Sequence, residues 1–593
     1  MKSKVLFGVF LSSLVLVSCK KDPEKEKLNF STKFELSNGL ETATYEETIS
    51  YYLRLAKDYS EINVQNIGTT DYGLPLHLVT FNPDANFNFG KIREDKAILF
   101  INNGIHPGES DGIDATMMLF RDLAIGKLKA PKNTVITAIP VYNVGGMHNR
   151  NSHSRANQNG PLSYGFRGNA LNYDLNRDFI KMDTKNAATF ASIFHMVKPD
   201  VFVDNHVSNG ADYQYTLTHL FTQHNKLGNE LGMYLETELK TQLEDSLQNK
   251  NWDITPYVNV FNRPPETGFS QFLDNPRYST GYTTLWNTLG LMVETHMLKP
   301  YKKRVEGTYA LMEQLISITD KDYEKIKKLK AETYKSQIEQ KTYFLNWTVD
   351  TTKTSALQFK GYKADTIVSA ITGKNRLKYD RSKPETYSVK YQNSYIPKDT
   401  ISVPDAYILP KSYTEVLQRL KQNNVQLKEI KKDTILTVET YRIEDYKTYG
   451  TAYEGHYPHY NTRVSTIVDT ITAKKGDFLI ATKQDAFRYL VETLEPIAVD
   501  SFFNWNFFDT VLQQKEGFSP YVFEDTALEI FEKDTLLKRE FEQKKATDTI
   551  FASNWYAQLD FIFKSSKYYE KAHLRYPIVR ITNNLYSLEG LVN

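Results

Sequence analysis

The chain of 593 residues is too long for one hydrophobic core, so it should hold two or more domains. Its hydrophobic fraction of 40% and charged fraction of 24% are those of a globular protein and exclude a disordered chain. The 73 Lys and Arg residues nearly balance 71 Asp and Glu residues, so the composition indicates no nucleic-acid partner.

The N-terminus has the pattern of a secretory signal peptide. Two lysines precede an apolar run from Val5 to Val17, which is too short to span a bilayer. The run leads into LVSC, which resembles the lipobox of bacterial lipoproteins and implies acylation of Cys19, the only cysteine of the chain. We therefore interpret residues 1–18 as a lipoprotein signal peptide and residues 19–39 as a tether. This predicts a protein anchored to the lipid membrane of a bacterial cell envelope, at the outer membrane or cell surface.

Helical and strand patterns alternate along the next part of the chain. Apolar spacing predicts a helix over residues 44–59, two strands within residues 62–81 and a buried strand over residues 98–103. A helix over residues 112–123 and a strand over residues 135–141 follow. This order predicts an α/β domain with a largely parallel or mixed sheet, whose functional loops lie beyond the carboxyl ends of its strands.

Polar residues follow three of the predicted strands. His106 and Glu109 come directly after the strand over residues 98–103, and a neutral imidazole and a carboxylate suit zinc, which takes three protein ligands in catalytic sites. A strand over residues 201–205 leads into His206, a third ligand of suitable type. A strand over residues 289–293 leads into Glu294, and a carboxylate at such a position is costly unless it is paired or functional. Glu294 is therefore a candidate general base.

The segment of residues 143–179 is rich in Asn, Gly and Arg and poor in apolar residues. A polar loop of this length inside a compact domain is more often functional than not. Its arginines suit planar recognition of a carboxylate. A solvated loop without a role is the alternative.

The order of HPGE, NYDLNRDF, a strand leading into His206 and the sequence MVETH resembles the zinc carboxypeptidase family related to carboxypeptidase A. The resemblance covers roughly residues 40–315 and implies a mixed-sheet catalytic domain over residues 40–319. It implies one Zn²⁺ per chain, held by His106, Glu109 and His206, with Glu294 as the catalytic glutamate.

The same resemblance assigns residues to the substrate. Asn176 and Arg177 match the pair that grips the terminal carboxylate, and Asp174 matches a carboxylate that orients the first ligand histidine. Arg167, nine residues before Asn176, matches the arginine that polarises the scissile carbonyl in the cytosolic branch, whereas the pancreatic-type spacing favours the region of Arg155. The positions considered for the family's mobile tyrosine are Tyr278 and Tyr282, although both lie closer to Glu294 than is usual. Arg277 beside them would select an acidic side chain.

The resemblance implies a zinc-dependent metallocarboxypeptidase that cleaves the C-terminal peptide bond of extracytoplasmic peptides with a free carboxylate. Two alternatives share the fold: an amidase or endopeptidase acting on cell-wall peptides, and a deacylase acting on N-acyl amino acids. A third is a non-catalytic surface-binding lipoprotein that works through its C-terminal region. The sequence names no protein partner.

The second half of the chain has a different sequence pattern. A charged stretch over residues 320–341 predicts a connecting helix, and short runs rich in Tyr, Thr, Val and Ile predict a β-rich region over residues 342–593, in one or two subdomains. Helices are predicted over residues 412–420, opened by a capping box, and 485–494. Glu454, His456 and His459 form either a second metal site or, as we favour, a surface turn. The aromatic residues within 501–508 predict a core or an interface, with carbohydrate binding as the alternative.

Overall fold

The computed structural model describes residues 30–582 of the chain. The predicted signal peptide, Cys19 and the first part of the tether lie outside the described residues. The last part of the predicted tether differs from expectation, because it forms helix α1 (Lys33–Leu36) and buries Phe30 and Phe34. Phe34 packs edge to face against Tyr301. This segment therefore belongs to the core of the first domain.

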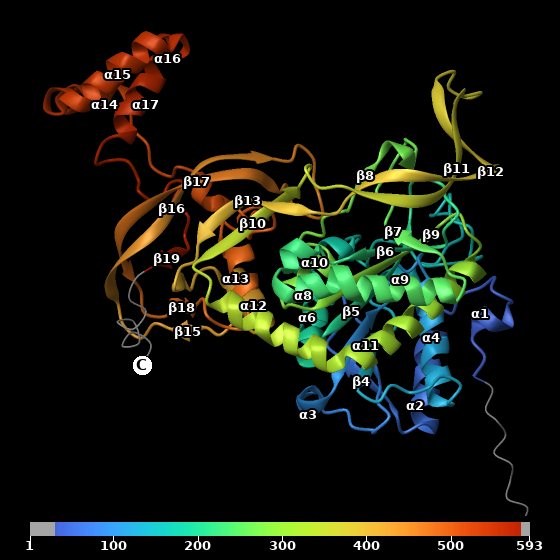
Figure 1. The fold of residues 1–593 in the computed structure, drawn as a ribbon. Coiled ribbons are helices and arrows are strands. Elements are labelled where there is room, and N and C mark those ends of the chain that lie inside the picture. The colour runs from blue at the N-terminus through green and yellow to red at the C-terminus, as the bar shows by residue number, and fades with distance from the viewer. Residues whose placement is uncertain (1–29, 583–593) are drawn as a thin grey trace, which may run out of the picture.

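The described residues of the first domain contain an eight-stranded sheet in the order β1-β2-β4-β3-β5-β9-β6-β7 (Figure 1). The strands β4, β3, β5 and β9 run parallel, and antiparallel pairs flank them. The predicted α/β fold with a mixed sheet is confirmed. The strands are β1 (Ile62–Ile67), β2 (Leu76–Phe81), β3 (Ala97–Asn102), β4 (Thr134–Ile139), β5 (Val201–Ser208), β6 (Leu217–Phe221), β7 (Ile254–Pro256) and β9 (Leu289–His296).

Amphipathic helices pack on this sheet and on one another. The predicted helix over residues 44–59 is α2, which opens with a capping box between Thr44 and Glu47. The helices of the first domain are α2 (Tyr45–Asp58), α3 (Phe89–Asp95), α4 (Asp111–Ala124), α5 (Val144–His148), α6 (Lys185–Val197), α7 (His224–Leu227), α8 (Asn229–Tyr234), α9 (Lys240–Asn249), α10 (Ser279–Thr284) and α11 (Tyr301–Ile338). Within residues 30–582, the helices are too short or too polar to cross a lipid bilayer.

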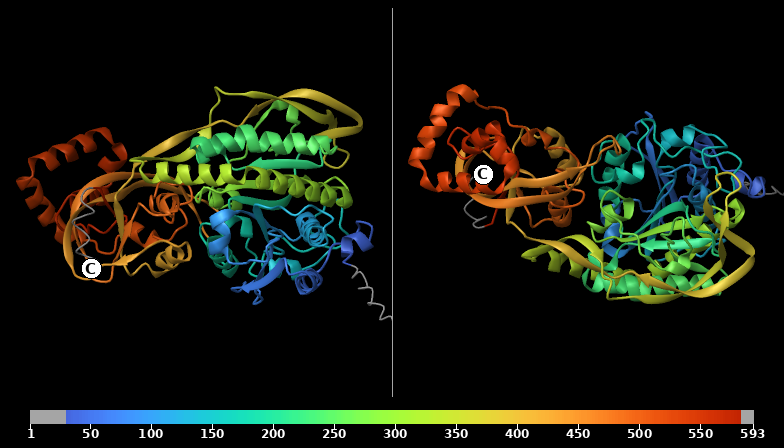
Figure 2. Two further views of the ribbon diagram at one scale, coloured as in Figure 1. Left: turned by 60° about the horizontal axis from the view of Figure 1, so that its bottom comes forward. Right: turned by 90° about the horizontal axis from the view of Figure 1, so that it is seen from above.

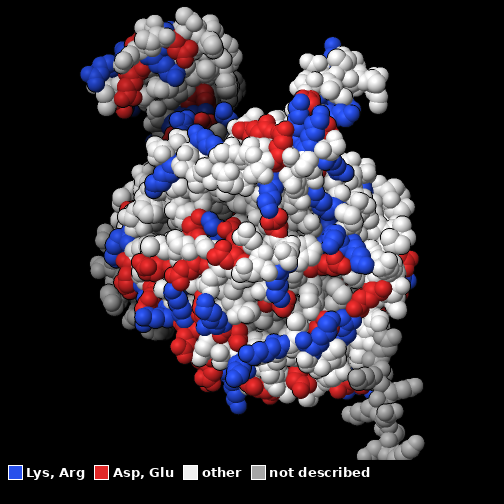
Figure 3. All heavy atoms as spheres, turned by 45° about the vertical axis from the view of Figure 1, so that its right-hand side comes forward, with Lys and Arg blue, Asp and Glu red and all other residues white. Residues whose placement is uncertain are grey.

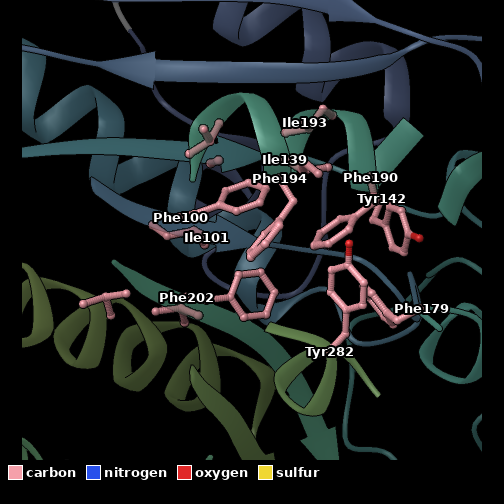
Figure 4. Packing of buried hydrophobic residues seen from close by; sticks show 14 of the residues in the cluster. Phe100, Ile101, Ile139, Tyr142, Phe179, Phe190, Ile193, Phe194, Phe202 and Tyr282 are labelled. Atoms are coloured by element: carbon pink, nitrogen blue, oxygen red, sulfur yellow. The ribbon is translucent and has the colours of Figure 1, made fainter. Parts of the chain in front are cut away.

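Aromatic side chains fill the space between the sheet and its helices. Phe100 of β3 and Phe202 of β5 pack against Phe190 of α6, and Tyr282 of α10 closes the cluster from the other side (Figure 4). All four side chains are buried. Burial of this much apolar surface holds the central strands, and with them their carboxyl ends, in place.

Two strands are longer than the sequence indicated. β5 continues through His206 to Ser208, and β9 continues through Glu294 to His296. The two residues are therefore partners in the ladder of adjacent parallel strands rather than loop residues beyond it. Since β3, β5 and β9 are neighbours, their carboxyl ends lie side by side at one edge of the sheet.

The helix predicted over residues 320–341 is the last part of a single long helix, α11, which already begins at Tyr301. It runs from the first domain to the C-terminal region, and the two lie side by side (Figure 2). The ribbon of β11 and β12 then runs back over the first domain, where β12 pairs with β8. The two regions are thus joined by packing as well as by the chain.

The C-terminal region contains a six-stranded sheet in the order β15-β18-β14-β19-β16-β17 and further β-ribbons. The strands from β8 onwards, apart from β9, are β8 (Phe269–Ser270), β10 (Thr342–Val349), β11 (Ser355–Val368), β12 (Asn375–Gln392), β13 (Tyr395–Ser402), β14 (Ala406–Leu409), β15 (Lys428–Glu429), β16 (Thr434–Thr448), β17 (His459–Ala473), β18 (Phe478–Ala481) and β19 (Val579–Ile581). The aromatic cluster is core, because Phe502, Phe503, Trp505 and Phe508 are buried. This burial excludes these four side chains from stacking on carbohydrate.

Helices in this region differ in part from expectation. The helices are α12 (Thr414–Gln422), α13 (Phe487–Leu494), α14 (Pro520–Lys533), α15 (Thr535–Thr547), α16 (Thr549–Ser553) and α17 (Trp555–Lys564). The capping box predicted at Ser412 is wrong, since α12 begins after Tyr413 without a side-chain cap. The group α14 to α17 was not predicted; it projects from the molecule around a small core that includes Phe541 and Phe563. Basic and acidic side chains are interspersed over the face drawn in Figure 3.

A buried ion pair links the two regions. Lys226 Nζ of α7 lies 3.0 Å from Glu492 Oε2 of α13, and the side chains are only 4% and 5% exposed. The Tyr343 hydroxyl donates a hydrogen bond to the other oxygen of Glu492. A charge left alone in such a place is strongly unfavourable.

We therefore expect Glu492→Gln to lower the free energy of unfolding by roughly 3 kcal/mol, because it strands the Lys226 charge. Lys226→Met combined with Glu492→Gln should recover part of this loss. Glu339→Gln, which breaks the exposed pair with Lys483, is the control and should change little. Urea denaturation followed by fluorescence measures all three, and wild-type stability of Glu492→Gln would contradict the assignment.

Candidate metal centre and its cavity

A cavity of about 490 Å³ opens at the carboxyl ends of β5 and β9. His106, Glu109, His206 and Glu294 line one part of it, and Asn176, Arg177 and Tyr278 line another. Apolar side chains complete the wall, among them Leu220, Phe261, Phe272, Met292 and Met297. The structure thus brings almost all of the predicted site residues together.

Three of these residues form a potential metal site. His106, Glu109 and His206 each offer a ligand atom, and the three atoms lie within 4.8 Å of one another. His106 Nδ1 is 3.2 Å from Glu109 Oε2, yet it has no hydrogen-bond partner among the described residues. A buried imidazole nitrogen without a partner, next to a second imidazole and a carboxylate, fits a zinc ion.

The opposite ring nitrogen of each histidine is bound by a carboxylate. His106 Nε2 lies 2.9 Å from Asp174 Oδ1, as predicted for Asp174, and His206 Nε2 lies 2.8 Å from Asp204 Oδ2. These contacts turn both Nδ1 atoms toward Glu109. Asp204 was not predicted, although its place two residues before His206 in one strand puts both side chains on the same face.

Glu109 is held by positive charge. Burial by itself raises the pKa of the Glu109 carboxyl. His106 and Arg155 lower this pKa by more than burial raises it, so it lies well below its usual range. Arg155 Nη1 donates to Glu109 Oε1 at 2.9 Å. The ionised form, which is the one that binds metal, is thereby favoured.

Both arginines considered for the carbonyl lie at the cavity. Arg167 is bound to Asp174, with Nη2 at 2.8 Å from Oδ2, and its Nη1 is 3.7 Å from Glu109 Oε1. Its side chain is 46% exposed, whereas that of Arg155 is 15% exposed and is fastened to Glu109. Arg167 is therefore the freer of the two to meet a substrate.

Glu294 stands beside His206 at the end of β9 and faces the cavity. Burial raises its pKa to about 7, His206 opposes that shift and Glu109 adds to it. A carboxylate with a raised pKa takes and returns a proton readily near neutral pH. Tyr257, which the sequence did not reveal, also lines the cavity, and burial together with the Glu294 charge raises the pKa of its hydroxyl.

The predicted carboxylate-binding pair lies close to Tyr278. Arg177 stacks over the Tyr278 ring at 4.6 Å, and Asn176 Oδ1 accepts a hydrogen bond from the Ser279 backbone. Burial lowers the pKa of Arg177, but Asp174, Tyr278 and Tyr453 raise it, and the net shift is upward. The guanidinium therefore stays charged at the wall of the cavity.

Two sequence expectations are corrected. Tyr282 is fully buried, and its hydroxyl donates to Asn423 Oδ1 at 2.6 Å, so it does not reach the cavity to contact a substrate. Arg277 is bound to Asp500, with Nη2 at 2.8 Å, and does not line the cavity, so its charge is not free to select an acidic side chain. In both cases the partner comes from the C-terminal region, which a local sequence pattern does not reveal.

No protein-family model matches the chain, and no curated protein matches its sequence. Among solved structures, the chain is similar to a metallo-carboxypeptidase from Burkholderia cenocepacia, with 16% identity, a TM-score of 0.35 and coverage of 47% of this chain and 70% of that chain. It is also similar to a metallo-carboxypeptidase from Pseudomonas aeruginosa in complex with (2-guanidinoethylmercapto)succinic acid, with 13% identity, a TM-score of 0.36 and coverage of 48% and 70%. A third similar structure is carboxypeptidase A from Helicoverpa armigera, with 14% identity, a TM-score of 0.35 and coverage of 49% of this chain and 73% of that chain.

We expect Asp204→Asn to weaken zinc binding by about 10- to 100-fold, because the carboxylate orients His206 and increases its basicity. Competition with a fluorescent chelator measures the affinity. Asp253→Asn, at an exposed ion pair with Lys360, is the matched control and should bind zinc as the wild type does. Wild-type affinity of Asp204→Asn would show that Asp204 has no such role.

Proposed function

We propose that the protein is a zinc-dependent metallocarboxypeptidase that removes the C-terminal residue from extracytoplasmic peptides. One observation carries the proposal: a single cavity holds the group of His106, Glu109 and His206, the carboxylate of Glu294, and the guanidinium of Arg177. These are the parts that hydrolysis of a terminal peptide bond needs.

Each residue has a role in the proposed reaction. His106, Glu109 and His206 would hold the zinc ion, which when bound would lower the pKa of water and polarise a carbonyl group. Glu294 accepts the proton of the attacking water and passes it to the departing amine. Arg167 donates to the carbonyl oxygen as negative charge develops there, and Asn176 and Arg177 bind the terminal carboxylate.

We propose in addition that the protein is attached to the bacterial envelope through acylated Cys19. The support is the N-terminal sequence, with its charged start, its apolar run and LVSC. Attachment there would give the cavity access to peptides outside the cytoplasm.

Two variants distinguish the role of zinc from the role of Glu294. Glu294→Gln should lower kcat by at least about 100-fold and keep one equivalent of zinc, because it removes the general base and leaves the ligands intact. His106→Ala should lose both zinc and activity. Metal analysis together with peptide hydrolysis measures both, and an active but zinc-free His106→Ala would overturn the metal assignment.

Paired peptides test whether cleavage requires a free C-terminal carboxylate on the substrate. Peptides with free C-termini should lose single residues, and their amidated counterparts should resist. Arg177→Ala should raise KM for the free peptides by roughly 10- to 100-fold, because a charged hydrogen bond to the substrate is lost. Equal cleavage of amidated peptides would indicate an endopeptidase or amidase instead, and faster turnover of N-acyl amino acids would indicate a deacylase.

A further inference from the structure

The turn between β16 and β17 has a strained backbone. Tyr453 and His456 pair across it, and the two residues between them, Glu454 and Gly455, have φ values of 49° and 80°. Two positive φ values in a two-residue hairpin loop define a type I′ turn, which favours Asn or Gly at both positions. A glutamate in the left-handed region is unfavourable, so its presence calls for a compensating contact.

The compensating contact is made to the substrate-binding segment of the first domain. Glu454 Oε2 accepts a hydrogen bond of 2.8 Å from the backbone N–H of Asp174. Gly455 lies against Tyr173, and a Cβ at this position would come within 2.7 Å of the Tyr173 hydroxyl oxygen. The tip of the hairpin therefore fits closely against the residues that precede Asn176 and Arg177.

Tyr453, the residue before Glu454, anchors the turn to the core of the C-terminal region, because its ring is stacked on Trp505, which is fully buried. Arg177 is placed by contacts within its own domain: Nη1 lies 3.8 Å from Asp174 Oδ2, and the guanidinium lies over the Tyr278 ring at 4.6 Å. Because Asp174 contacts Arg177, the hydrogen bond between Glu454 and the Asp174 backbone also bears on the position of Arg177.

Further contacts keep the turn in place. His456 Nε2 lies 2.8 Å from Asp183 Oδ2, which also contacts Lys181, while Asp183 Oδ1 binds Arg419. His456 and Glu454 thus have separate partners, and within residues 30–582 neither belongs to a group of side chains that could hold a metal ion. Asp500 binds both the backbone and the side chain of Arg277, the residue before Tyr278.

We propose that Glu454 is a positioning residue for the terminal-carboxylate site, and that the C-terminal region is a structural part of the active site rather than a separate module. Glu454 fixes the backbone from which Asp174, Asn176 and Arg177 project. The inference rests on the proposed carboxypeptidase function. An interdomain contact that only adds stability is the competing explanation.

The test compares single variants of the full, zinc-loaded protein on peptides with free C-termini. Loss of the Glu454 contact should raise KM, with kcat and zinc content within about twofold of wild type, because substrate and transition state lose the same support. Tyr457→Phe, an exposed tyrosine of the same loop, is the control and should leave KM unchanged.

Glu454→Gly separates positioning from stability. Glycine relieves the left-handed strain, so the unfolding temperature should equal or exceed that of the wild type, while KM should rise about fivefold to tenfold because the Asp174 N–H loses its partner. Glu454→Gln keeps an acceptor and should recover most of the KM loss. A purely stabilising contact would instead move the unfolding temperature and leave KM alone.

The outcomes distinguish the two proposals. If the wild type cleaves but Glu454→Gly keeps its KM, the positioning role is overturned and the carboxypeptidase function stands. If the zinc-loaded wild type releases no residue from any free C-terminus, both fall. A raised KM in Glu454→Gly that Glu454→Gln largely recovers, with an unchanged control, supports the inference.

Discussion

Several buried carboxylates surround two imidazole rings at the site. The site depends on groups that balance the negative charge of these carboxylates. Glu109 and Asp204 are almost fully buried, and Asp174 and Glu294 lie beside them. Isolated carboxylates in such surroundings are very unfavourable. Here Asp174 and Asp204 bind the histidines, Arg155 and Arg167 contact Glu109, and a divalent cation would supply the remaining charge. The same contacts fix which ring nitrogen faces the metal.

The central sheet determines where these groups meet. Three neighbouring parallel strands, β3, β5 and β9, bring their carboxyl ends to one edge. His206 and Glu294 are ladder partners within two of these strands, and His106 and Glu109 follow the third. Because strands held by an aromatic core move little, they form a rigid support for the metal ligands and for the general base. The carboxylate-binding pair instead lies in an irregular segment and needs support from elsewhere.

That support comes from the C-terminal region. Glu454, in the hairpin of β16 and β17, accepts a hydrogen bond from the Asp174 backbone, and Asp500 holds the chain before Tyr278. The two regions also share the buried pair of Lys226 and Glu492 and the contact of Tyr282 with Asn423. A region that contributes this many buried polar contacts cannot move away without disturbing the cavity.

The sequence by itself determined the central strands of the first domain, the helices α2 and α4 and the residues that gather at His106, because apolar periodicity and the positions of polar residues at strand ends are local features. It did not reveal α3, the helices from α5 to α10, or strands β6 and β7. It also pointed to Asp174, Asn176 and Arg177 through one short motif. It did not reveal the burial of Tyr282, the pairing of Arg277 with Asp500, Asp204 behind His206, or the turn at Glu454. Tyr282, Arg277 and Glu454 each depend on a partner between 141 and 280 residues away in the chain, and the role of Asp204 depends on which way its strand faces. Only the tertiary structure decided them, because side-chain contacts between distant segments follow from packing, and packing leaves no periodic signal in the sequence.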